Sequence, residues 1–481
     1  MTEIENLKPK LVWKHFDEIR KTPRCSKHEE KIRKYIVEFA KNHNLKSKVD
    51  KTGNVIISKP ASPGMEKITT VILQGHMDMV CEKNSDITFD FSKEPIKLKL
   101  KGDILTADGT TLGADNGIGL AISLAILEDK TLKHGPIEAL FTVDEETGLT
   151  GAFAMEKDML TGKILLNLDS EDFGVITVGC AGGGESKIVL PVKTQPVDKN
   201  QVPLMIKVSG LRGGHSGVDI HEQRGNAVKL LTRILWKAKG YDFSISNIKG
   251  GDKHNAIPRE AFALVSVNKS DKDKFISTLK SEEKAIFEEI KPIDPKFKVV
   301  VENNEGLKTT LVKNSQDKLL NLLHGLPHGV DKMSYDIPTL VETSTNLATV
   351  EIKGGTAEIG LSTRSSIKSA LQDFRDRIRA IAELSGASVK EDTPYPGWKP
   401  NLDSKILALS KKIFKEMYGK EPVVEAIHAG LECGIIGEKF PGMDMVSIGP
   451  TIKYPHSPEE QVHVSTVDKF YKYVLMILEK I

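Results

Sequence analysis

The stretch TTVILQGHMDMV (residues 69–80) begins as a buried strand and ends in a histidine and an aspartate. Apolar residues run without interruption from Val71 to Leu73, which is typical of a strand that is covered on both faces of a parallel sheet. Side chains two residues apart in a strand point the same way, so Asp78 can orient the imidazole of His76. We therefore expect a rigid strand that carries a ligand histidine, His76, at its tip, with Asp78 fixing the ring.

Short apolar runs surround this strand and alternate with helical patterns. They are NVIIS (54–58), IEALFTVD (137–144) and KILLNLD (163–169), with the helical GIGLAISLAILED (117–129) between the strands. This alternation predicts an α/β fold with a mixed, mostly parallel sheet covered by helices. Ser26 and Glu29 have capping-box spacing and predict a helix over residues 26–40, with Ile32, Ile36 and Phe39 on its apolar face.

The pattern changes near residue 185 and changes back near residue 400. SKIVLPVK (186–193) and VPLMIKVSG (202–210) alternate more clearly, and helical stretches follow near 225–239 and 272–290. These features predict an α+β insertion with an antiparallel sheet, whose second half, 298–395, looks similar to its first. The Pro-rich TPYPGWKP (393–400) then leads back to the first pattern. We expect a discontinuous catalytic domain, 1–185 and 400–481, interrupted by a lid domain, 186–399.

Composition excludes several classes of protein. The 481 residues include 68 Lys and Arg against 66 Asp and Glu, and this balance does not favour nucleic acid as a partner. No apolar run reaches 18 residues, so we expect no membrane span. The N-terminal MTEIENLKPKLVWKHFDEIRK (1–21) does not read as a secretory signal, and a cytoplasmic location is the expectation. The four cysteines have no C-x-x-C spacing and are expected to be reduced thiols: Cys25, Cys81, Cys180 and Cys433.

Several acidic and histidine side chains occur where the predicted strands end or a helix begins. Each alone is most often a cap or a surface residue, but carboxylates gathered in one crevice repel one another and take up protons unless cations neutralise them. Few basic residues accompany them, so a pair of divalent metals is favoured over salt bridges. Imidazole and carboxylate donors without cysteine fit zinc, manganese or cobalt. The candidates are His76, Asp78, Asp115, Glu145, Glu146, Asp169 and His456.

Glu145 and Glu146 are adjacent and follow the predicted strand at 137–144. Neighbouring side chains in an extended segment cannot both aim at one point, so we expect them to have different roles. One should bind a metal, and the other should accept a proton from a water molecule.

Eight motifs now identify a family resemblance that extends over most of the chain. In their order, they closely resemble the aminoacyl-histidine dipeptidases, also called peptidase D, Xaa-His dipeptidase or beta-alanyl-histidine dipeptidase. These enzymes belong to the co-catalytic di-zinc peptidases and aminoacylases. The motifs are GHMDMV (75–80), GADNGIGLA (113–121), DEETGLTGA (144–152), LNLDSED (166–172), GGHSG (213–217), HNAIPRE (254–260), HAGLECG (428–434) and YPHSPEEQVH (454–463).

The resemblance implies a zinc-peptidase-like catalytic domain that hydrolyses dipeptides, preferentially Xaa-His dipeptides such as carnosine, through a metal-bridging hydroxide. It implies two divalent metals, zinc first, with cobalt or manganese as alternatives. Asp115 would bridge them, and in the family the peptide bond after this aspartate is often cis. His76 and Asp169 would complete one metal site, and Glu146 and His456 the other. Glu145 would be the general base, while Asp78 fixes His76.

Residues of the insertion resemble the family's substrate-binding positions. His215 of GGHSG resembles a histidine that hydrogen-bonds the tetrahedral oxyanion, although a turn histidine between glycines is the simpler alternative. Asn255 and Arg364 resemble substrate-binding residues, and a guanidinium suits a terminal carboxylate because its fork binds both oxygens; an ordinary strand-surface arginine is the alternative. His428 and Glu432 are expected to line the same crevice, with a structural helix cap as the alternative.

The expected partners are a small peptide and, from the resemblance, a second copy in a homodimer. The alternatives within the same chemistry are a broader dipeptidase, an aminotripeptidase and an N-acyl amino acid deacylase. A non-catalytic peptide-binding relative is the alternative from another class. The glycine-rich GCAGGGES (179–186) lacks the ending of a phosphate-binding loop and is expected to be a hinge or turn.

Overall fold

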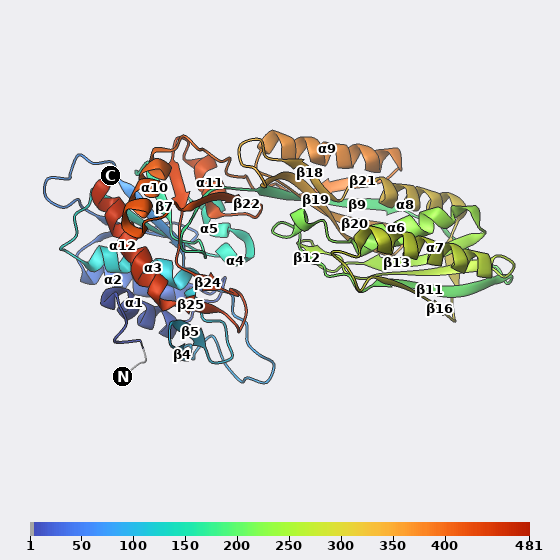
Figure 1. The fold of residues 1–481 in the computed structure, drawn as a ribbon, viewed down its shortest axis with the longest axis horizontal. Coiled ribbons are helices and arrows are strands. Elements are labelled where there is room, and N and C mark those ends of the chain that lie inside the picture. Colours follow the sequence, from blue (N-terminus) through green and yellow to red (C-terminus); the bar gives the residue numbers. More distant parts are fainter. Residues whose placement is uncertain (1–3) are drawn as a thin grey trace. The chain divides into compact units, whose positions relative to one another are not determined.

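The chain folds into two compact units. The computed structural model describes residues 4–481. Unit 1 extends to Gly179 and includes Trp398–Ala426 and Leu431–Ile481, while unit 2 comprises Cys180–Gly397 and Ile427–Gly430. Figure 1 shows the helices and strands of both units.

Unit 1 is built on an eight-stranded mixed sheet, as expected for the α/β class. Strand β3 is buried along its whole length and pairs in parallel with β6 and β7, and β7 pairs in parallel with β23. Strands β1, β2 and β6 are antiparallel neighbours at one side. The order along the sheet is β1 (Lys46–Val49), β2 (Val55–Lys59), β6 (Ile137–Thr142), β3 (Val71–His76), β7 (Ile164–Asn167), β23 (Asp444–Ser447), β8 (Val175–Cys180) and β22 (Val423–Ile427).

Helices cover this sheet, and α1, α3 and α12 gather in one region of unit 1 (Figure 1). Helix α3 is apolar on nearly all sides and is almost wholly buried, which suits a helix at the centre of a unit. Helix α12 buries Val467, Phe470, Val474 and Leu478, the apolar face seen in its sequence. The helices are α1 (Lys10–Lys21), α2 (Glu30–Asn42), α3 (Ala114–Glu128), α4 (Glu145–Gly148), α5 (Thr150–Ala154), α10 (Lys405–Tyr418), α11 (Glu432–Lys439) and α12 (Val464–Lys480).

The predicted capping box at Ser26 is wrong. Helix α2 starts at Glu30, and its N-cap position makes no side-chain hydrogen bond to the helix. The Ser26 hydroxyl instead donates to the carboxylate of Asp78 at 2.8 Å, because this segment lies next to the end of β3. The predicted apolar face is present, since Ile32, Ile36 and Phe39 are buried.

A four-stranded antiparallel sheet forms a second element of unit 1. Its order is β24 (Ile452–Lys453), β25 (Gln461–His463), β5 (Ile104–Ala107) and β4 (Leu98–Lys101). The segment between β24 and β25 contains the YPHSPEE sequence, so this hairpin presents His456.

Unit 2 is an α+β unit whose large sheet pairs its strands antiparallel, as the sequence predicts. Helices α6 (Ala227–Lys237), α7 (Lys272–Ile290), α8 (Lys313–Gly325) and α9 (Lys368–Leu384) lie along the sheet (Figure 1) and share its apolar core. The order is β16 (Lys298–Asn303), β11 (Gln201–Ser209), β15 (Ala261–Asn268), β13 (Phe243–Gly250), β19 (Val341–Lys353), β20 (Thr356–Ser365), β9 (Gly182–Pro191) and β21 (Ser388–Glu391), with β18 (Gly329–Met333) also paired to β19.

Two short ribbons complete unit 2. Strands β10 (Thr194–Pro196) and β17 (Thr309–Leu311) pair with each other. Strands β12 (Gly214–His215) and β14 (Ala256–Ile257) form the other ribbon, which places His215 opposite Ala256. Two 3₁₀ turns, Ile220–Glu222 and Ala238–Gly240, flank α6.

The glycine-rich stretch at 179–186 does not form a turn; it contains the boundary between the two units, and the expected hinge stays a prediction. From Gly182 onward it is strand β9, paired with β20 on one side. A Cβ atom at Gly183 would lie 2.5 Å from the hydroxyl of Tyr395, so this glycine leaves room for a tyrosine ring. Gly183 therefore allows Tyr395 to pack closely against the strand.

The expectation of four reduced thiols is also wrong. Cys25 and Cys81 form a disulfide between the segment before α2 and the segment after β3. Cys180 and Cys433 are buried and are not in a disulfide. Among residues 4–481, no helix combines the length and the apolar character needed to cross a membrane.

Candidate functional site

The acidic and histidine candidates of unit 1 meet at the carboxyl ends of its parallel strands. His76 is the last residue of β3, Asp169 lies two residues beyond β7, and the Glu145–Glu146 pair starts three residues beyond β6. Parallel neighbours end at the same edge of the sheet, and loops converge on a crevice there. Asp115 comes from the first turn of α3 and His456 from the β24–β25 hairpin.

Asp115 faces one imidazole with each of its two carboxylate oxygens. Its Oδ1 lies 3.1 Å from His76 Nε2, and its Oδ2 lies 3.0 Å from His456 Nε2. Asp169 Oδ1 is 3.3 Å from the same nitrogen of His76, and Glu146 Oε2 is 2.9 Å from the same nitrogen of His456. The side chains thus form two groups that share Asp115, one with His76 and Asp169 and one with Glu146 and His456. In each group the ligand atoms lie within 4.8 Å of one another.

Asp78 connects His76 to the glutamate pair. The Nδ1 atom of His76 is 3.1 Å from the backbone oxygen of Asp78 and 3.3 Å from its Oδ1. The carboxylate of Asp78 also accepts the backbone N–H groups of Glu145 at 3.0 Å and Glu146 at 3.2 Å. Burial favours its protonation, but His76, the Glu145 N–H and the Ser26 hydroxyl outweigh burial and lower the pKa of Asp78 to about 2. Asp78 is therefore an anion that orients the ring of His76.

Glu145 and Glu146 lie in a short helix, α4, and not in an extended segment as expected. The helical turn lets both carboxylates approach His76, and the three ligand atoms lie within 4.8 Å of one another. Of these two glutamates, Glu146 is the one that contacts His456, through its Oε2 at 2.9 Å. Burial, together with the neighbouring acids Asp169 and Glu432, raises the pKa of Glu145 well above its ordinary value.

The donor set fits divalent cations. Burial raises the pKa of Asp169 and of Glu146, which means that the folded chain supplies too little positive charge for these carboxylates. Among the described residues, the buried Oε1 of Glu146 has no hydrogen-bond partner, and the buried Oδ1 of Asp169 has none apart from its 3.3 Å contact with His76 Nε2. Burial opposes protonation of His456, but Asp115 and Glu146 raise its pKa to about 11, so the acids draw positive charge to this site. Two imidazoles and three carboxylates without cysteine match zinc, manganese or cobalt.

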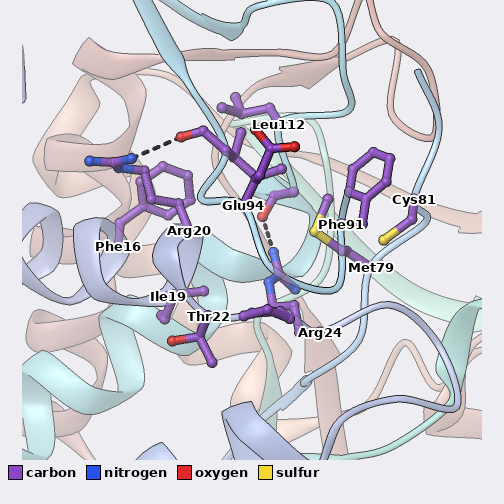
Figure 2. A pocket seen from close by; sticks show the side chains of 13 residues that line it. Phe16, Ile19, Arg20, Thr22, Arg24, Met79, Cys81, Phe91, Glu94 and Leu112 are labelled. Carbon is purple, nitrogen blue, oxygen red and sulfur yellow. Dashed lines mark hydrogen bonds between the residues drawn. The ribbon is translucent and has the colours of Figure 1, made fainter. Parts of the chain in front are cut away.

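Sequence reasoning missed two buried charged residues that hold the backbone of this site. The carboxylate of Glu460 accepts four consecutive backbone N–H groups, from Leu112 to Asp115, at 2.8 to 3.2 Å. Arg24 donates to the carbonyl oxygens of Met77, Asp78 and Gly113. Figure 2 shows Arg24 beside Met79 in a small pocket that is also lined by Cys81 and Leu112. Glu460 lies within a quoted motif, whereas Arg24 carries no sequence signal.

Glu432 lies in unit 1 and is 1% exposed. Its Oε2 accepts hydrogen bonds from the Gln74 amide at 2.6 Å and the Thr142 hydroxyl at 2.7 Å. It makes no side-chain cap to α11, so the structural alternative of a helix cap is wrong. Burial raises the pKa of Glu432 to about 7. The side chain supports strands β3 and β6 next to His76 instead of facing solvent.

In unit 2, His215, Arg364 and His428 converge around Gly217. A Cβ atom at Gly217 would lie 3.1 Å from the ring of His215 and 3.2 Å from the Nε of Arg364, and it would also contact the carbonyl oxygen of His428. The Nδ1 of His215 accepts the backbone N–H groups of Gly217 and Val218 at 3.2 and 3.0 Å. Because Nδ1 is the acceptor, the neutral ring carries its proton on Nε2. Burial and Arg364 lower the pKa of His215, which favours this neutral form.

His428 and Asn255 lie in the same unit. His428 Nε2 is 2.7 Å from the Ser344 hydroxyl, and burial together with Arg364 lowers its pKa to about 3. Asn255 is exposed in the turn before β14, and its backbone oxygen accepts the N–H of Ser216 at 2.8 Å. Among the substrate-binding candidates, Glu432 belongs to unit 1 and the other four to unit 2.

Comparison with known proteins gives consistent matches. Residues 72–480 match the model of peptidase family M20/M25/M40. The cytosol non-specific dipeptidase of Escherichia coli (strain K12) is 39% identical over 482 residues, which covers 100% of this chain and 99% of that protein. The crystal structure of the aminoacylhistidine dipeptidase from Vibrio alginolyticus matches with a TM-score of 0.91 and 41% identity, over 100% of this chain and 98% of that one. The aminopeptidase PepT from Bacillus cereus ATCC 10987 shares the fold alone, with a TM-score of 0.56 and 18% identity over 98% of this chain and 99% of that one.

Proposed function

The chain belongs to peptidase family M20/M25/M40, and from this premise we propose that it is a metal-dependent dipeptidase that prefers dipeptides with a C-terminal histidine. The observation that carries the proposal is the position of Asp115 between two imidazoles, each accompanied by a further carboxylate. The relatives named as dipeptidases, from Escherichia coli and Vibrio alginolyticus, align with essentially the whole chain and support the substrate class.

Five side chains would hold two divalent ions, which we propose to be zinc. Asp115 would be shared, with His76 and Asp169 on one side and Glu146 and His456 on the other. The bound ions would supply Lewis acidity that polarises a peptide carbonyl and makes water acidic. Asp78 would keep His76 in the orientation required for binding, since it contacts the Nδ1 side of that ring.

Glu145 would act as the general base. Its carboxylate lies beside His76, whereas Glu146 is the glutamate that approaches His456, and burial among other acids gives Glu145 a high affinity for a proton. In the proposed step it accepts a proton from the attacking water and passes it to the nitrogen of the scissile bond. That bond then breaks to give a carboxylic acid and an amine, so the proton balance closes.

Unit 2 would act as the lid domain. We propose that His215 donates its Nε2–H to the oxyanion of the tetrahedral intermediate, which its tautomer permits. Arg364 would bind the carboxylate end of the peptide, with Asn255 and His428 beside it. Glu432 would support the site from beneath β3 rather than contact the peptide.

The decisive experiment is metal analysis combined with a substrate panel. Purified protein should contain about two equivalents of zinc and should hydrolyse carnosine and glycyl-histidine faster than dipeptides without histidine. The Escherichia coli relative is called non-specific, so equal rates on other dipeptides would point to a broader dipeptidase. Activity confined to tripeptides or acetylated amino acids would refute the dipeptidase proposal, and metal without turnover on any substrate would favour a peptide-binding protein.

The proposal also includes a location in the cell and an oligomeric state. A cytoplasmic location is supported by the name of the Escherichia coli relative, which refers to the cytosol. A homodimer is proposed from the family resemblance, and size-exclusion chromatography with light scattering tests it.

A further inference from the structure

The loop that follows His215 closes back on the backbone of that histidine. The N–H of His215 donates to Oδ2 of Asp219 at 2.7 Å, and its carbonyl oxygen accepts the N–H of Asp219 at 3.0 Å. The Nδ1 of the ring accepts the N–H groups of Gly217 and Val218, which lie between these two residues. The tautomer of His215 therefore depends on the shape of a loop that Asp219 closes.

Arg224 holds the other oxygen of the Asp219 carboxylate. Its Nη2 donates to Asp219 Oδ1 at 3.1 Å, so this carboxylate bridges the guanidinium and the backbone of His215. Its Nη1 donates to the carbonyl oxygen of Gly213 at 2.6 Å, two residues before the histidine. One planar guanidinium thus contacts the chain on both sides of His215.

Glu222 fixes the orientation of this guanidinium. Its Oε1 and Oε2 accept hydrogen bonds from Nη2 and Nε of Arg224 at 2.8 and 2.9 Å, a bidentate pair that sets the plane of the fork. The four hydrogen bonds that the Arg224 side chain makes within residues 4–481 all go to the loop 213–222. The side chain is 11% exposed, so solvent screens these contacts less than it would at the surface.

Gly214 leaves the space in which this arrangement fits. Its φ of +147° is one that L side chains rarely adopt. A Cβ atom at this position would collide with Nη1 of Arg224 and would lie 2.6 Å from Oδ2 of Asp219. The residue directly before His215 is therefore restricted to glycine by the two side chains that hold the loop.

We propose that Arg224 is a positioning residue for His215, and that it maintains the Nε2–H tautomer of this histidine through Asp219 and Gly213. The inference rests on the proposed function, in which His215 donates its Nε2–H to an oxyanion, and it identifies what holds that donor in place. Neither Arg224 nor Asp219 was among the candidates that the sequence motifs provided. The alternative is an arginine that stabilises unit 2 without acting through His215.

A double-mutant cycle on the zinc-loaded protein separates these two roles. Arg224→Met removes the guanidinium donors and keeps an unbranched side chain. It should lower kcat for glycyl-histidine about tenfold and change KM less than about twofold, because an oxyanion donor acts mainly in the transition state and a shift of about an ångström weakens it. In the His215→Ala background the same change should lower kcat less than about twofold.

Arg212→Ala is the matched control for the cycle. Arg212 is an exposed arginine of the same segment that lies 3.6 Å from Glu222. Its removal takes away a positive charge near the loop but leaves Arg224, Asp219 and their hydrogen bonds in place. It should leave kcat unchanged in both backgrounds.

Nitrogen NMR on zinc-loaded protein with isotope-labelled histidine gives a readout that does not require turnover. The ring signals of His215, assigned through His215→Ala, should show the Nε2–H tautomer in wild type. Arg224→Met should show a mixture of both tautomers, because the loop no longer holds its N–H groups against Nδ1. Arg212→Ala should resemble wild type.

A second variant covers a failure of Arg224→Met to fold. Asp219→Asn offers one acceptor oxygen where the carboxylate uses two, so it should give the same loss of kcat and the same mixture of tautomers.

Where His215→Ala lowers kcat, an equal loss in both backgrounds or no loss in either would overturn the inference. An unchanged His215 tautomer in Arg224→Met would overturn it as well. If His215→Ala has the kcat of wild type but Arg224→Met still shifts the tautomer, the oxyanion role in the proposed function fails, and the positioning of His215 by Arg224 stands.

Discussion

Glu460 holds the backbone of Asp115 from a position 345 residues later in the chain. Its Oε1 accepts the N–H groups of Ala114 and Asp115 at 2.8 and 3.2 Å, while its Oε2 accepts those of Leu112 and Gly113 at 2.8 and 2.9 Å. Four donors on one carboxylate fix the loop that presents Asp115. The position of the shared ligand thus depends on a residue four positions after His456.

The first prediction is that Glu460→Gln weakens metal binding. The new amide places N–H donors against backbone N–H groups, and leaving such groups unsatisfied costs about 1 to 3 kcal/mol. We expect a 10- to 100-fold loss of zinc affinity, measured by competition with a chromogenic chelator. Glu459→Gln, at the exposed neighbouring residue, is the control and should bind zinc normally. Equal affinities in the two variants would show that the clamp does not position Asp115.

The second prediction separates the roles of Glu145 and His456. Glu145→Ala should keep both metals but lose nearly all turnover, because the proposed base is removed and all five ligands remain. His456→Ala should lose metal, because its Nε2 faces both Asp115 and Glu146. Elemental analysis after dialysis, together with carnosine hydrolysis, measures both effects. Equal metal loss in the two variants would contradict the division.

The third prediction concerns His215. Because two backbone N–H groups occupy its Nδ1, only Nε2–H can serve an oxyanion. His215→Ala should lower kcat by about 10² to 10³ with little change in KM, as expected for a contact that is made mainly in the transition state. Steady-state kinetics with glycyl-histidine measure this. His221→Ala, at an exposed histidine of the same unit, is the comparison, and a similar kcat for both variants would remove His215 from the mechanism.

Much of the fold could be predicted because apolar periodicity reflects burial directly. The helix predicted at 272–290 is α7, and the apolar positions predicted for the helix over 26–40, Ile32, Ile36 and Phe39, are the buried face of α2. The local predictions failed where a distant segment decided the outcome. Ser26 has capping-box spacing, but its hydroxyl donates to Asp78. The glycines after Gly179 predict a hinge or turn from sequence alone, and the packing of Tyr395 against Gly183 is not visible there.

The candidate site could also be predicted only where the signal is local in the sequence. Side chains at strand ends could be selected because parallel strands finish at one edge, and the geometry brings those of unit 1 together around Asp115. The supporting residues could not be selected. Arg24 and Glu460 act on backbone atoms of remote segments, and no spacing in the sequence encodes such a contact. The sequence predicts an extended segment at Glu145 and Glu146, whereas both residues lie in a short helix that turns their side chains toward His76.

The fourth prediction follows from the Cys25–Cys81 disulfide. Alkylation of denatured, unreduced protein should label two cysteines, Cys180 and Cys433, and reduction should raise the number to four. The crosslink spans 56 positions, so loop entropy gives it about 4 kcal/mol of stabilisation, and reduction should lower the melting temperature of unit 1. Cys81→Ser should melt like the reduced protein. Four reactive thiols before reduction would show that the pair is open.

The fifth prediction is a loss of stability in mild acid that depends on His15. This histidine of α1 is 2% exposed and contacts Glu128 at 2.8 Å and Tyr35 at 3.3 Å. Burial lowers its pKa from 6.5 to about 4, with Lys14 and His43 adding to the shift and Glu128 opposing it. Between these values the unfolded chain binds more protons than the folded chain. Stability is therefore fully present above pH 6.5 and falls as the pH drops toward 4.

The shift corresponds to at most about 3 kcal/mol at 1.36 kcal/mol per pKa unit. His15→Gln removes the contacts with Glu128 and Tyr35, so the variant should be less stable than wild type at pH 7. It also removes the titrating group, so only the wild type loses stability in acid, and the difference in unfolding free energy between the two proteins should narrow by pH 4.5. Urea unfolding of both proteins at half-unit pH steps measures this difference. His28→Gln, at an exposed histidine of the same unit, should follow the wild-type curve. A gap that widens in acid would mean that folded His15 is protonated and paired with Glu128 as an ion pair, and a constant gap would mean that folding does not shift its pKa.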